Sequence, residues 1–211
     1  MIRGLYLVTD STLVGDRTLT DVVMAAVGGG ARTVQLREKT AETRAFVDLA
    51  RALRVLLAPR GVPLIINDRV DVALAAGADG VHIGRNDMAY PDARQLLGPE
   101  AVIGLSAESM DDVTRAERYD VDYLGVSPIF PSSTKTDTVG TWGIDGLAEV
   151  RRQSRHRLVA IGGLHAGNVG EVVAAGADAV AVVSAVCAAA DPRAAASELA
   201  ALVAAGAGHR L

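Results

Sequence analysis

Lysine, cysteine and aromatic residues are scarce in this sequence, and each shortage narrows the classes of protein that it can encode. Of 21 basic residues only two are lysine, Lys39 and Lys135, and aromatic residues make up 3% of the chain. The one cysteine, Cys187, cannot form an internal disulfide, so we expect a reducing compartment, the cytoplasm. Since large rings are rare, the 37 alanines and 22 glycines must carry the packing of helices and tight turns.

Long hydrophobic runs and an excess of positive charge are also missing. The longest apolar stretch, Ala179–Ala190, is shorter than the roughly 18 residues that span a bilayer, so no membrane partner is expected. The chain enters a β-type segment at Leu5–Thr9, which indicates a strand and not a signal peptide. A formal net charge of −4 argues against nucleic acid as a partner, because such proteins usually present a basic face.

Eight short β-type runs alternate with helical patterns along the chain. The predicted strands are Leu5–Thr9, Thr33–Arg37, Pro63–Asn67, Gly80–Gly84, Val102–Ser106, Tyr123–Ser127, Leu158–Gly162 and Ala179–Ser184. The predicted helices cover residues 18–29, 41–58, 69–76, 89–97, 109–118, 144–154, 167–175 and 192–205. The strands are continuously apolar and do not alternate with polar residues, which is typical of parallel strands covered by helices on both faces.

The size and the joints of the repeated unit favour a closed barrel. Dividing 211 residues by eight gives about 26 per unit, enough for one strand, one helix and two short loops. Three helix-to-strand joints repeat a glycine, Gly30, Gly77 and Gly176, for which we predict the left-handed conformation that ends a helix. A doubly wound open sheet is the alternative, but it usually has fewer strands and a Gly-x-Gly-x-x-Gly after the first. The sequence therefore predicts an α/β fold, a single (β/α)₈ TIM barrel domain over residues 1–211.

Polar residues gather where the predicted strands end. In such barrels the active site lies at the carboxyl ends of the strands. The opposite ends carry mostly alanine, glycine and aspartate, and a barrel that served only as a scaffold would not need charged groups on several strands. This asymmetry predicts an enzyme. No Ser–His–Asp order is visible, and we expect His82 to pack or to donate a hydrogen bond and not to catalyse.

Two anion sites are predicted at this end. Gly162 and Gly163 after the seventh strand, with Ser184 after the eighth, occupy the usual phosphate cradle of the fold, although a glycine pair more often serves a tight turn. The second site begins with Arg37 and Lys39, which are two residues apart and so point the same way. It also includes a loop of hydroxyl residues that ends in a lysine, Ser132, Ser133, Thr134 and Lys135.

The two lysines of the chain thus both fall in the second anion site. Where arginine has replaced lysine almost everywhere, a compact ammonium remains where a broad guanidinium does not fit. The alternative for this cluster is a set of solvated surface charges.

Asp68 and Asp87 follow adjacent predicted strands, the third and the fourth. Two carboxylates without histidine or thiolate partners suit Mg²⁺, which takes oxygen ligands and often bridges protein to substrate phosphates. The alternative is helix capping, by Asp68 near Arg69 and by Asp87 near Ala89. Because two anion sites converge here, we favour the metal.

Several motifs along the chain, in a fixed order and spacing, carry a family resemblance. They are Gln35-Leu36-Arg37-Glu38-Lys39, Ile66-Asn67-Asp68, His82-x-Gly84-x-x-Asp87, Gly104-Leu105-Ser106-Ala107, Pro128 through Lys135, and Ala160-Ile161-Gly162-Gly163. With them the chain resembles the thiamine-phosphate synthases, enzymes that join the two halves of thiamine. The resemblance runs from Tyr6 to Ala185, almost the entire chain.

The resemblance implies a reaction of 4-amino-2-methyl-5-(diphosphooxymethyl)pyrimidine with 4-methyl-5-(2-phosphooxyethyl)thiazole, or its carboxylate, to thiamine phosphate and pyrophosphate. It implies a pyrimidine diphosphate site of Gln35, Leu36, Arg37, Glu38, Lys39, Asn67, Ser106 and Lys135. The thiazole phosphate site would comprise Ser132, Ser133, Thr134, Gly163, Val183 and Ser184. One Mg²⁺ per active site would be held by Asp68 and Asp87, and the catalytic residues would be Arg37, Lys39, Ser106 and Lys135.

The implied mechanism is a dissociative, Mg²⁺-assisted substitution. Diphosphate leaves the CH₂ of the aminopyrimidine, and the thiazole nitrogen captures the resulting cation. No protein nucleophile or strong base is needed, so the protein's part is to neutralise the departing diphosphate and to hold the nucleophile in line.

Two positions depart from the family pattern, and two alternatives for the function stay open. Arg85 stands where the family usually has glutamine, and Glu108 where histidine is common. A thiazole tautomerase on the same barrel would need an acid–base group but no diphosphate clamp or metal pair. A non-catalytic sensor would bind a phosphorylated ligand without turnover. A homo-oligomer is possible, and the sequence does not decide it.

Overall fold

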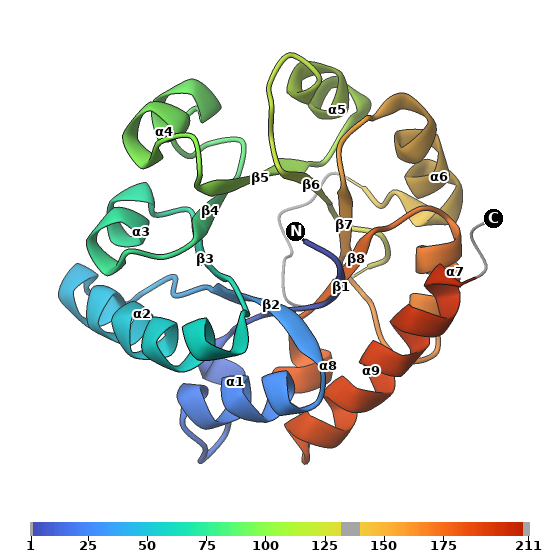
Figure 1. Ribbon diagram of the computed structural model, residues 1–211. Helices are drawn as coiled ribbons and strands as arrows, with labels where there is room; N and C mark the ends of the chain where they lie inside the picture. Colours follow the sequence, from blue (N-terminus) through green and yellow to red (C-terminus); the bar gives the residue numbers. More distant parts are fainter. Residues whose placement is uncertain (1, 132–139, 209–211) are drawn as a thin grey trace.

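A computed structural model describes residues 2–131 and 140–208, which form one closed parallel barrel of eight strands (Figure 1). The strands follow one another in chain order, and β8 pairs with β1 to close the ring. Their bounds are β1 Gly4–Val8, β2 Ala31–Leu36, β3 Leu64–Asn67, β4 Gly80–Ile83, β5 Val102–Ala107, β6 Tyr123–Val126, β7 Leu158–Ile161 and β8 Ala179–Val182. The predicted (β/α)₈ TIM barrel is confirmed.

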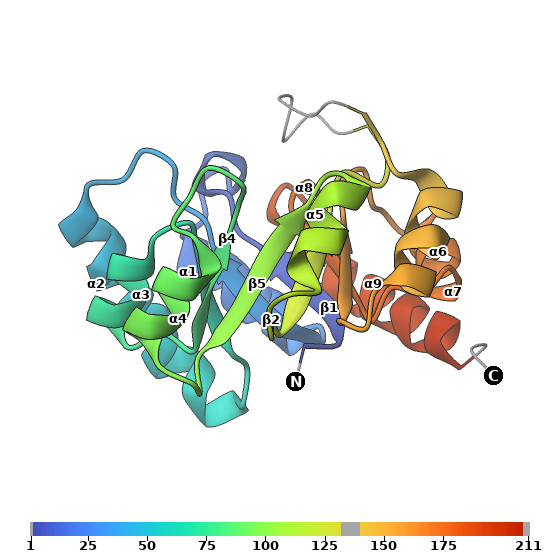
Figure 2. The same cartoon turned by 90° about the horizontal axis from the view of Figure 1, so that it is seen from above.

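Helices surround the barrel on the outside (Figures 1 and 2). They are α1 Leu19–Gly28, α2 Thr43–Leu57, α3 Val70–Ala76, α4 Tyr90–Leu97, α5 Met110–Ala116, α6 Gly143–Gln153, α7 Val169–Ala174, α8 Ser184–Cys187 and α9 Pro192–Ala207, with short 3₁₀ turns at Ser11–Leu13 (η1) and Ala58–Arg60 (η2). Within the described ranges, no helix combines the length and the apolar character needed to cross a membrane.

The predicted strands and long helices are all present, with bounds that differ by at most two residues. One difference concerns a site residue. Ser184 was expected at the end of the eighth strand, but β8 ends at Val182 and Ser184 is the first residue of the short helix α8. The apolar run that continues past the strand carries no signal that separates strand from helix, so this boundary was wrong.

Two apolar layers hold the barrel together. One layer fills the barrel interior and includes Tyr6, Ile65 and Tyr123, while the other lies between the strands and the helices and includes Leu5 and Leu7. Neighbouring residues of β1 belong to different layers because successive side chains of a strand point to opposite faces. The interior layer sets how deep any ligand can enter from the open end.

The repeated glycine joints have the predicted backbone. Gly30, Gly77 and Gly176 all have positive φ, at 110°, 63° and 121°. The aspartates that follow two of them bind the preceding strand: Asp79 accepts the Leu64 N–H at 2.8 Å, and Asp178 accepts the Leu158 N–H at 2.9 Å. These joints connect helices to strands at the amino ends of the strands, here called the closed end of the barrel. The opposite end, at the carboxyl ends of the strands, is left for the site.

Candidate active site

A cavity of about 1140 Å³ lies at the carboxyl end of the barrel. Residues from the ends of all eight strands or from the loops after them line it. The predicted site residues among the lining are Gln35, Arg37, Lys39, Asn67, Asp68, Asp87, Ser106, Gly163, Val183 and Ser184. Segments far apart in the sequence therefore supply one concave site, as the polar strand ends predicted.

Leu36 and Glu38 are not part of the cavity lining. Side chains alternate along β2, so Leu36 is fully buried in the layer between strands and helices, while Gln35 and Arg37 face the cavity. Glu38 accepts the Ser11 hydroxyl at 3.0 Å through Oε2, and its buried Oε1 has no hydrogen-bond partner in the part of the chain that the structure describes. The remaining predicted residues, Ser132, Ser133, Thr134 and Lys135, lie outside the described residues.

Two basic residues directly after β2, Arg37 and Lys39, both line the cavity. Arg37 forms an ion pair with Asp10 at 3.4 Å, and its backbone N–H donates to Thr9 Oγ1 at 3.0 Å. Lys39 forms an ion pair with Asp68 at 3.2 Å. Two cations thus stand at one side of the mouth, each oriented by a carboxylate.

Asp68 and Asp87 form an acidic pair beside these cations. Asp68 is the one non-glycine residue with positive φ (64°) among those described, and its N–H donates to the His82 carbonyl at 2.8 Å. Asp87 accepts the Gly84 N–H at 2.7 Å. Burial, and then the neighbouring Asp68 carboxylate, raise the pKa of Asp87, while the Gly84 N–H and the Lys39 ammonium act in the opposite direction. Two carboxylates held this close to each other favour a cation between them.

The structure weighs against helix capping as the role of these aspartates. The N-cap of α3 is Arg69 and that of α4 is Ala89, and neither makes a side-chain capping bond. Within the described segments, no cluster of three or more His, Cys, Asp or Glu side chains could hold a metal by itself. A divalent cation at Asp68 and Asp87 would therefore take further oxygen ligands from water or from a bound phosphate.

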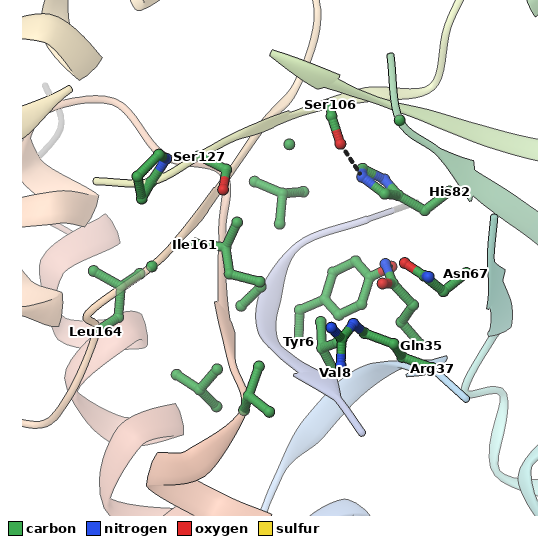
Figure 3. Close-up of a pocket in the computed structure, with 18 of the residues that line it drawn as sticks. Tyr6, Val8, Gln35, Arg37, Asn67, His82, Ser106, Ser127, Ile161 and Leu164 are labelled. Atoms are coloured by element: carbon green, nitrogen blue, oxygen red, sulfur yellow. Dashed lines mark hydrogen bonds between the residues drawn. The ribbon is translucent and has the colours of Figure 1, made fainter. Parts of the chain in front are cut away.

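A chain of buried hydrogen bonds, here called the floor network, crosses the bottom of the cavity. The Gln35 amide nitrogen donates to the Tyr6 hydroxyl at 2.9 Å, and the Tyr6 and Tyr123 hydroxyls lie 2.9 Å apart. The Tyr123 hydroxyl lies 3.1 Å from His82 Nδ1, and His82 Nε2 lies 3.0 Å from the Ser106 hydroxyl (Figure 3). The expectation that His82 is a hydrogen-bonding residue agrees with these contacts.

The sequence reasoning missed the two tyrosines of the floor network. Tyr6 lies within β1 and Tyr123 is the first residue of β6, both on inward positions and not at the carboxyl ends of the strands, where polar residues were sought. A signal did exist, because tyrosine is one of the few residues that bring a polar group into a barrel interior and two of the four tyrosines fall on strands.

Gly162 and Gly163 allow the loop after β6 to approach β7. Both have positive φ, 105° and 66°. A Cβ on Gly162 would lie 2.7 Å from Pro128 Cβ, and one on Gly163 would lie 2.6 Å from the Pro131 carbonyl oxygen. Close packing thus accounts for both glycines, and both also line the cavity.

The two positions that depart from the family pattern, Arg85 and Glu108, lie at the rim of the cavity. Arg85 donates to Asp112 at 2.7 Å, and the Glu108 backbone N–H donates to the same carboxylate at 3.1 Å. Burial opposes ionisation of Asp112, but hydrogen bonds from Arg85, Ser109 and Glu108 outweigh it and lower its pKa. Arg85 is therefore held toward α5 at the edge of the site.

Sequence relatives share one description. Residues 5–186 match the family described as thiamine monophosphate synthase. A protein of Albidiferax ferrireducens named thiamine-phosphate synthase is 59% identical over 199 residues, which cover 94% of this chain and 91% of that protein. A protein of Xanthobacter autotrophicus with the same name is 54% identical over 199 residues, 94% of each chain.

Solved structures agree with the sequence relatives. The thiamine phosphate pyrophosphorylase from Pyrococcus furiosus has a TM-score of 0.89 and 36% identity, with 97% of both chains covered. A structure of 3-hexulose-6-phosphate synthase, at 19% identity and a TM-score of 0.70, shares the fold alone. With this fold, this cavity and these relatives, the chain belongs to the thiamine monophosphate synthase family and is an enzyme of the transferase class.

Proposed function

We propose that this enzyme condenses 4-amino-2-methyl-5-(diphosphooxymethyl)pyrimidine with 4-methyl-5-(2-phosphooxyethyl)thiazole to thiamine phosphate and pyrophosphate. If the thiazole carboxylate is the substrate, CO₂ is released as a third product. The observation that carries the proposal is the meeting of two carboxylates, Asp68 and Asp87, with two cations, Arg37 and Lys39, on one side of a single cavity. That combination suits a diphosphate with a divalent cation.

The two sides of the cavity suit two different substrates. In Figure 3, Gln35, Arg37, Asn67 and His82 lie on one side, and Ile161 and Leu164 lie on the other. We assign the pyrimidine diphosphate to the polar side. We assign the thiazole phosphate to the opposite side, where Gly163, Val183 and Ser184 line the cavity beside apolar residues. Lys135 and the hydroxyls of Ser132–Thr134 remain assigned to these ligands from the sequence.

The residues present fit one Mg²⁺ per active site. Asp68 and Asp87 supply hard oxygen donors, and their mutual repulsion gives a cation a favourable place. When bound, Mg²⁺ would supply positive charge to the diphosphate and make it a better leaving group. The ammonium of Lys39 already contacts Asp68 and would contribute to the same field.

In the proposed reaction the bond between the pyrimidine CH₂ and the diphosphate oxygen breaks, and a bond from the CH₂ to the thiazole nitrogen forms. Arg37 and Lys39 would hold the negative charge of the diphosphate as it departs. Ser106, on the floor of the cavity, would contact the pyrimidine near the CH₂. The residues on the two sides of the cavity would hold the thiazole nitrogen in line with that carbon.

The direct test is turnover. Purified protein with both substrates and Mg²⁺ should form thiamine phosphate and one equivalent of pyrophosphate, and EDTA should stop the reaction. Absence of product would overturn the synthase. Undiminished product in EDTA would overturn the metal assignment alone. Interconversion of thiazole isomers without the pyrimidine substrate would instead indicate a tautomerase.

Removal of one cation tests the diphosphate side. Lys39→Ala and Lys135→Ala should each lower kcat by about 10²–10³-fold with the fold intact, by analogy with other preorganised charges. Arg51→Ala is the matched control, because Arg51 is exposed on α2 and does not line the cavity. If Lys39→Ala or Lys135→Ala turns over as fast as Arg51→Ala, the lysine in question is only a surface charge.

We also propose that the enzyme acts in the cytoplasm. Burial raises the pKa of the Cys187 thiol and keeps this single cysteine unreactive, which fits a protein that relies on no disulfide. Cell fractionation should recover the activity in the cytoplasmic fraction, and recovery in a secreted fraction would contradict the assignment.

A further inference from the structure

We propose that the floor network has one fixed hydrogen-bond direction. In that direction His82 is the neutral tautomer with its proton on Nε2, and the Ser106 hydroxyl donates its own proton into the cavity. Ser106 thereby requires a hydrogen-bond acceptor on the bound substrate, and the tyrosines behind it are positioning residues.

The direction begins at Gln35. An amide nitrogen can only donate, so the Tyr6 oxygen accepts at 2.9 Å. The Tyr6 hydroxyl must then donate its own proton. Among the described residues the acceptor within reach is the Tyr123 oxygen, also at 2.9 Å. The opposite direction between the two phenols would leave the buried Tyr6 proton unpaired, which costs free energy. Tyr6 therefore donates to Tyr123.

Both phenols keep their protons. Burial raises the pKa of Tyr6 and raises that of Tyr123 well above its ordinary value, because a phenolate is poorly stabilised away from water. Tyr123 accepts from Tyr6 and so gives its own proton to His82 Nδ1, 3.1 Å away. A neutral imidazole that accepts at Nδ1 carries its proton on Nε2.

The last step reaches the cavity. His82 Nε2 lies 3.0 Å from Ser106 Oγ, so the imidazole donates and the serine oxygen accepts. A hydroxyl that accepts from one side gives its proton elsewhere, and Ser106 lines the cavity. The dashed contact in Figure 3 is this final bond, at the edge of the open space.

Two glycines keep the rings of the floor network in place. The His82 and Tyr123 rings stack with centroids 5.5 Å apart. A Cβ on Gly125 would lie 2.8 Å from His82 Cε1, and one on Gly104 would lie 2.1 Å from Tyr123 Cζ. Both rings thus fill space that only glycine leaves, and this holds the ring atoms at the positions on which the hydrogen bonds depend.

The fixed donor acts on substrate orientation. A substrate whose ring nitrogen lies opposite Ser106 can bind, because that nitrogen accepts the hydroxyl proton. A substrate with an amino group at the same place binds poorly, because two hydrogen-bond donors would face each other. That the acceptor belongs to the pyrimidine rests on the proposed function. The tautomer of His82 and the direction of the network do not, since both follow from contacts within the protein.

Nitrogen NMR of histidine-labelled protein tests the direction without any substrate. His82→Gln identifies the His82 signals among the four histidines. Wild-type His82 should have a protonated Nε2 and an unprotonated Nδ1. Tyr123→Phe should convert part of the population to the Nδ1–H tautomer, whereas Tyr6→Phe, which removes the same group one step further away, should keep the wild-type pattern. An Nδ1–H tautomer of His82 in the wild type, or an equal change in tautomer population in the two variants, would overturn the proposal. If a variant fails to fold, the wild-type spectrum alone still tests the direction.

A double-mutant cycle then tests the action on substrate. Tyr123→Phe should raise KM for the pyrimidine diphosphate about 3- to 10-fold, the range of one hydrogen bond, with a smaller change in kcat. In a Ser106→Ala background the same change should add less than about twofold, because its effect passes through Ser106. Independent, multiplying effects would contradict the positioning role. A protein with the expected tautomer but no turnover would contradict the proposed function and not the direction.

Discussion

Asp68 has a backbone conformation that L-residues rarely adopt. Its φ of 64° costs about 1–2 kcal/mol for a residue with a side chain, although aspartate tolerates it better than most. The strain is retained where the Asp68 carboxylate meets both Lys39 and Asp87. Strained residues concentrate at functional sites, and here the conformation directs a carboxylate into the cavity.

Asp68→Gly separates strain from function. Glycine adopts positive φ freely, so the free energy of unfolding should stay the same or rise by up to about 1 kcal/mol, as urea denaturation would measure. Turnover should nevertheless fall by about 10²-fold or more, because a metal ligand is lost. Asp68→Asn is the control that keeps the side-chain size. A stable Asp68→Gly variant with wild-type turnover would remove Asp68 from the site.

Asp112 predicts a pH dependence at the rim. Its lowered pKa means that ionised Asp112 stabilises the fold above the ordinary aspartate pKa of about 4, and that this stability is lost as the pH falls through the lowered value. Asp112→Asn should lower the free energy of unfolding by about 1–2 kcal/mol at neutral pH. The difference from wild type should shrink below about pH 4. A difference that does not depend on pH would show that packing, and not charge, holds Arg85.

At the scale of elements, β5 and β6 leave space for the rings of the floor network. Gly104 on β5 lies under the Tyr123 ring, and Gly125 on β6 lies against the His82 ring. Glycine weakens a strand, so its use on both of these adjacent strands, opposite Tyr123 on β6 and opposite Ser106 on β5, indicates that ring placement matters more than strand propensity. The strands therefore position the network as well as form the barrel wall.

Two glycine-to-alanine changes test this reading. Gly104→Ala should lower the free energy of unfolding by about 1–3 kcal/mol, because its Cβ would overlap the buried Tyr123 ring. Gly170→Ala in helix α7 meets nothing within 4 Å and should raise that free energy by about 0.5–1 kcal/mol. Thermal and urea unfolding measure both. Equal effects from the two substitutions would mean that the space beneath the ring is not needed.

At the scale of the whole molecule, the net charge of −4 does not prevent basic side chains from gathering in the cavity, where Arg37, Lys39 and Arg85 lie among the acidic residues Asp68, Asp87 and Glu108. The cations of the cavity come from the ends of β2 and β4, while many acidic residues bind partners elsewhere, such as Asp79 and Asp178 at the closed end. The parallel order of β2, β3 and β4 brings these cations to one edge of the barrel. The enzyme can thus stay acidic overall and still bind anionic ligands.

Mg²⁺ and inorganic pyrophosphate should therefore stabilise the protein together. Mg²⁺ alone or pyrophosphate alone should raise the melting temperature little, whereas the two together at saturating concentrations should raise it by several degrees. The reason is that a ligand bound only to the folded state stabilises that state. Differential scanning fluorimetry measures the shift. Asp87→Asn should abolish the joint effect but keep the fold. Full stabilisation by pyrophosphate in EDTA would show that the cations alone bind it.

The sequence by itself determined the barrel, its strands and the end at which the site lies. Continuous apolar strands and glycine joints act locally, so their pattern is visible in one dimension. The same holds for Arg37 and Lys39, which were predicted at the end of the second strand and lie directly after β2, in the cavity.

The tertiary structure alone decided which of these residues meet. Tyr6 and Tyr123 are 117 positions apart, and their contact exists only because the closed barrel turns both inward. The tertiary structure also decided where β8 ends, since Ser184 is the first residue of α8 and not the end of the strand. Contacts between distant segments depend on barrel closure and register, which no local pattern encodes.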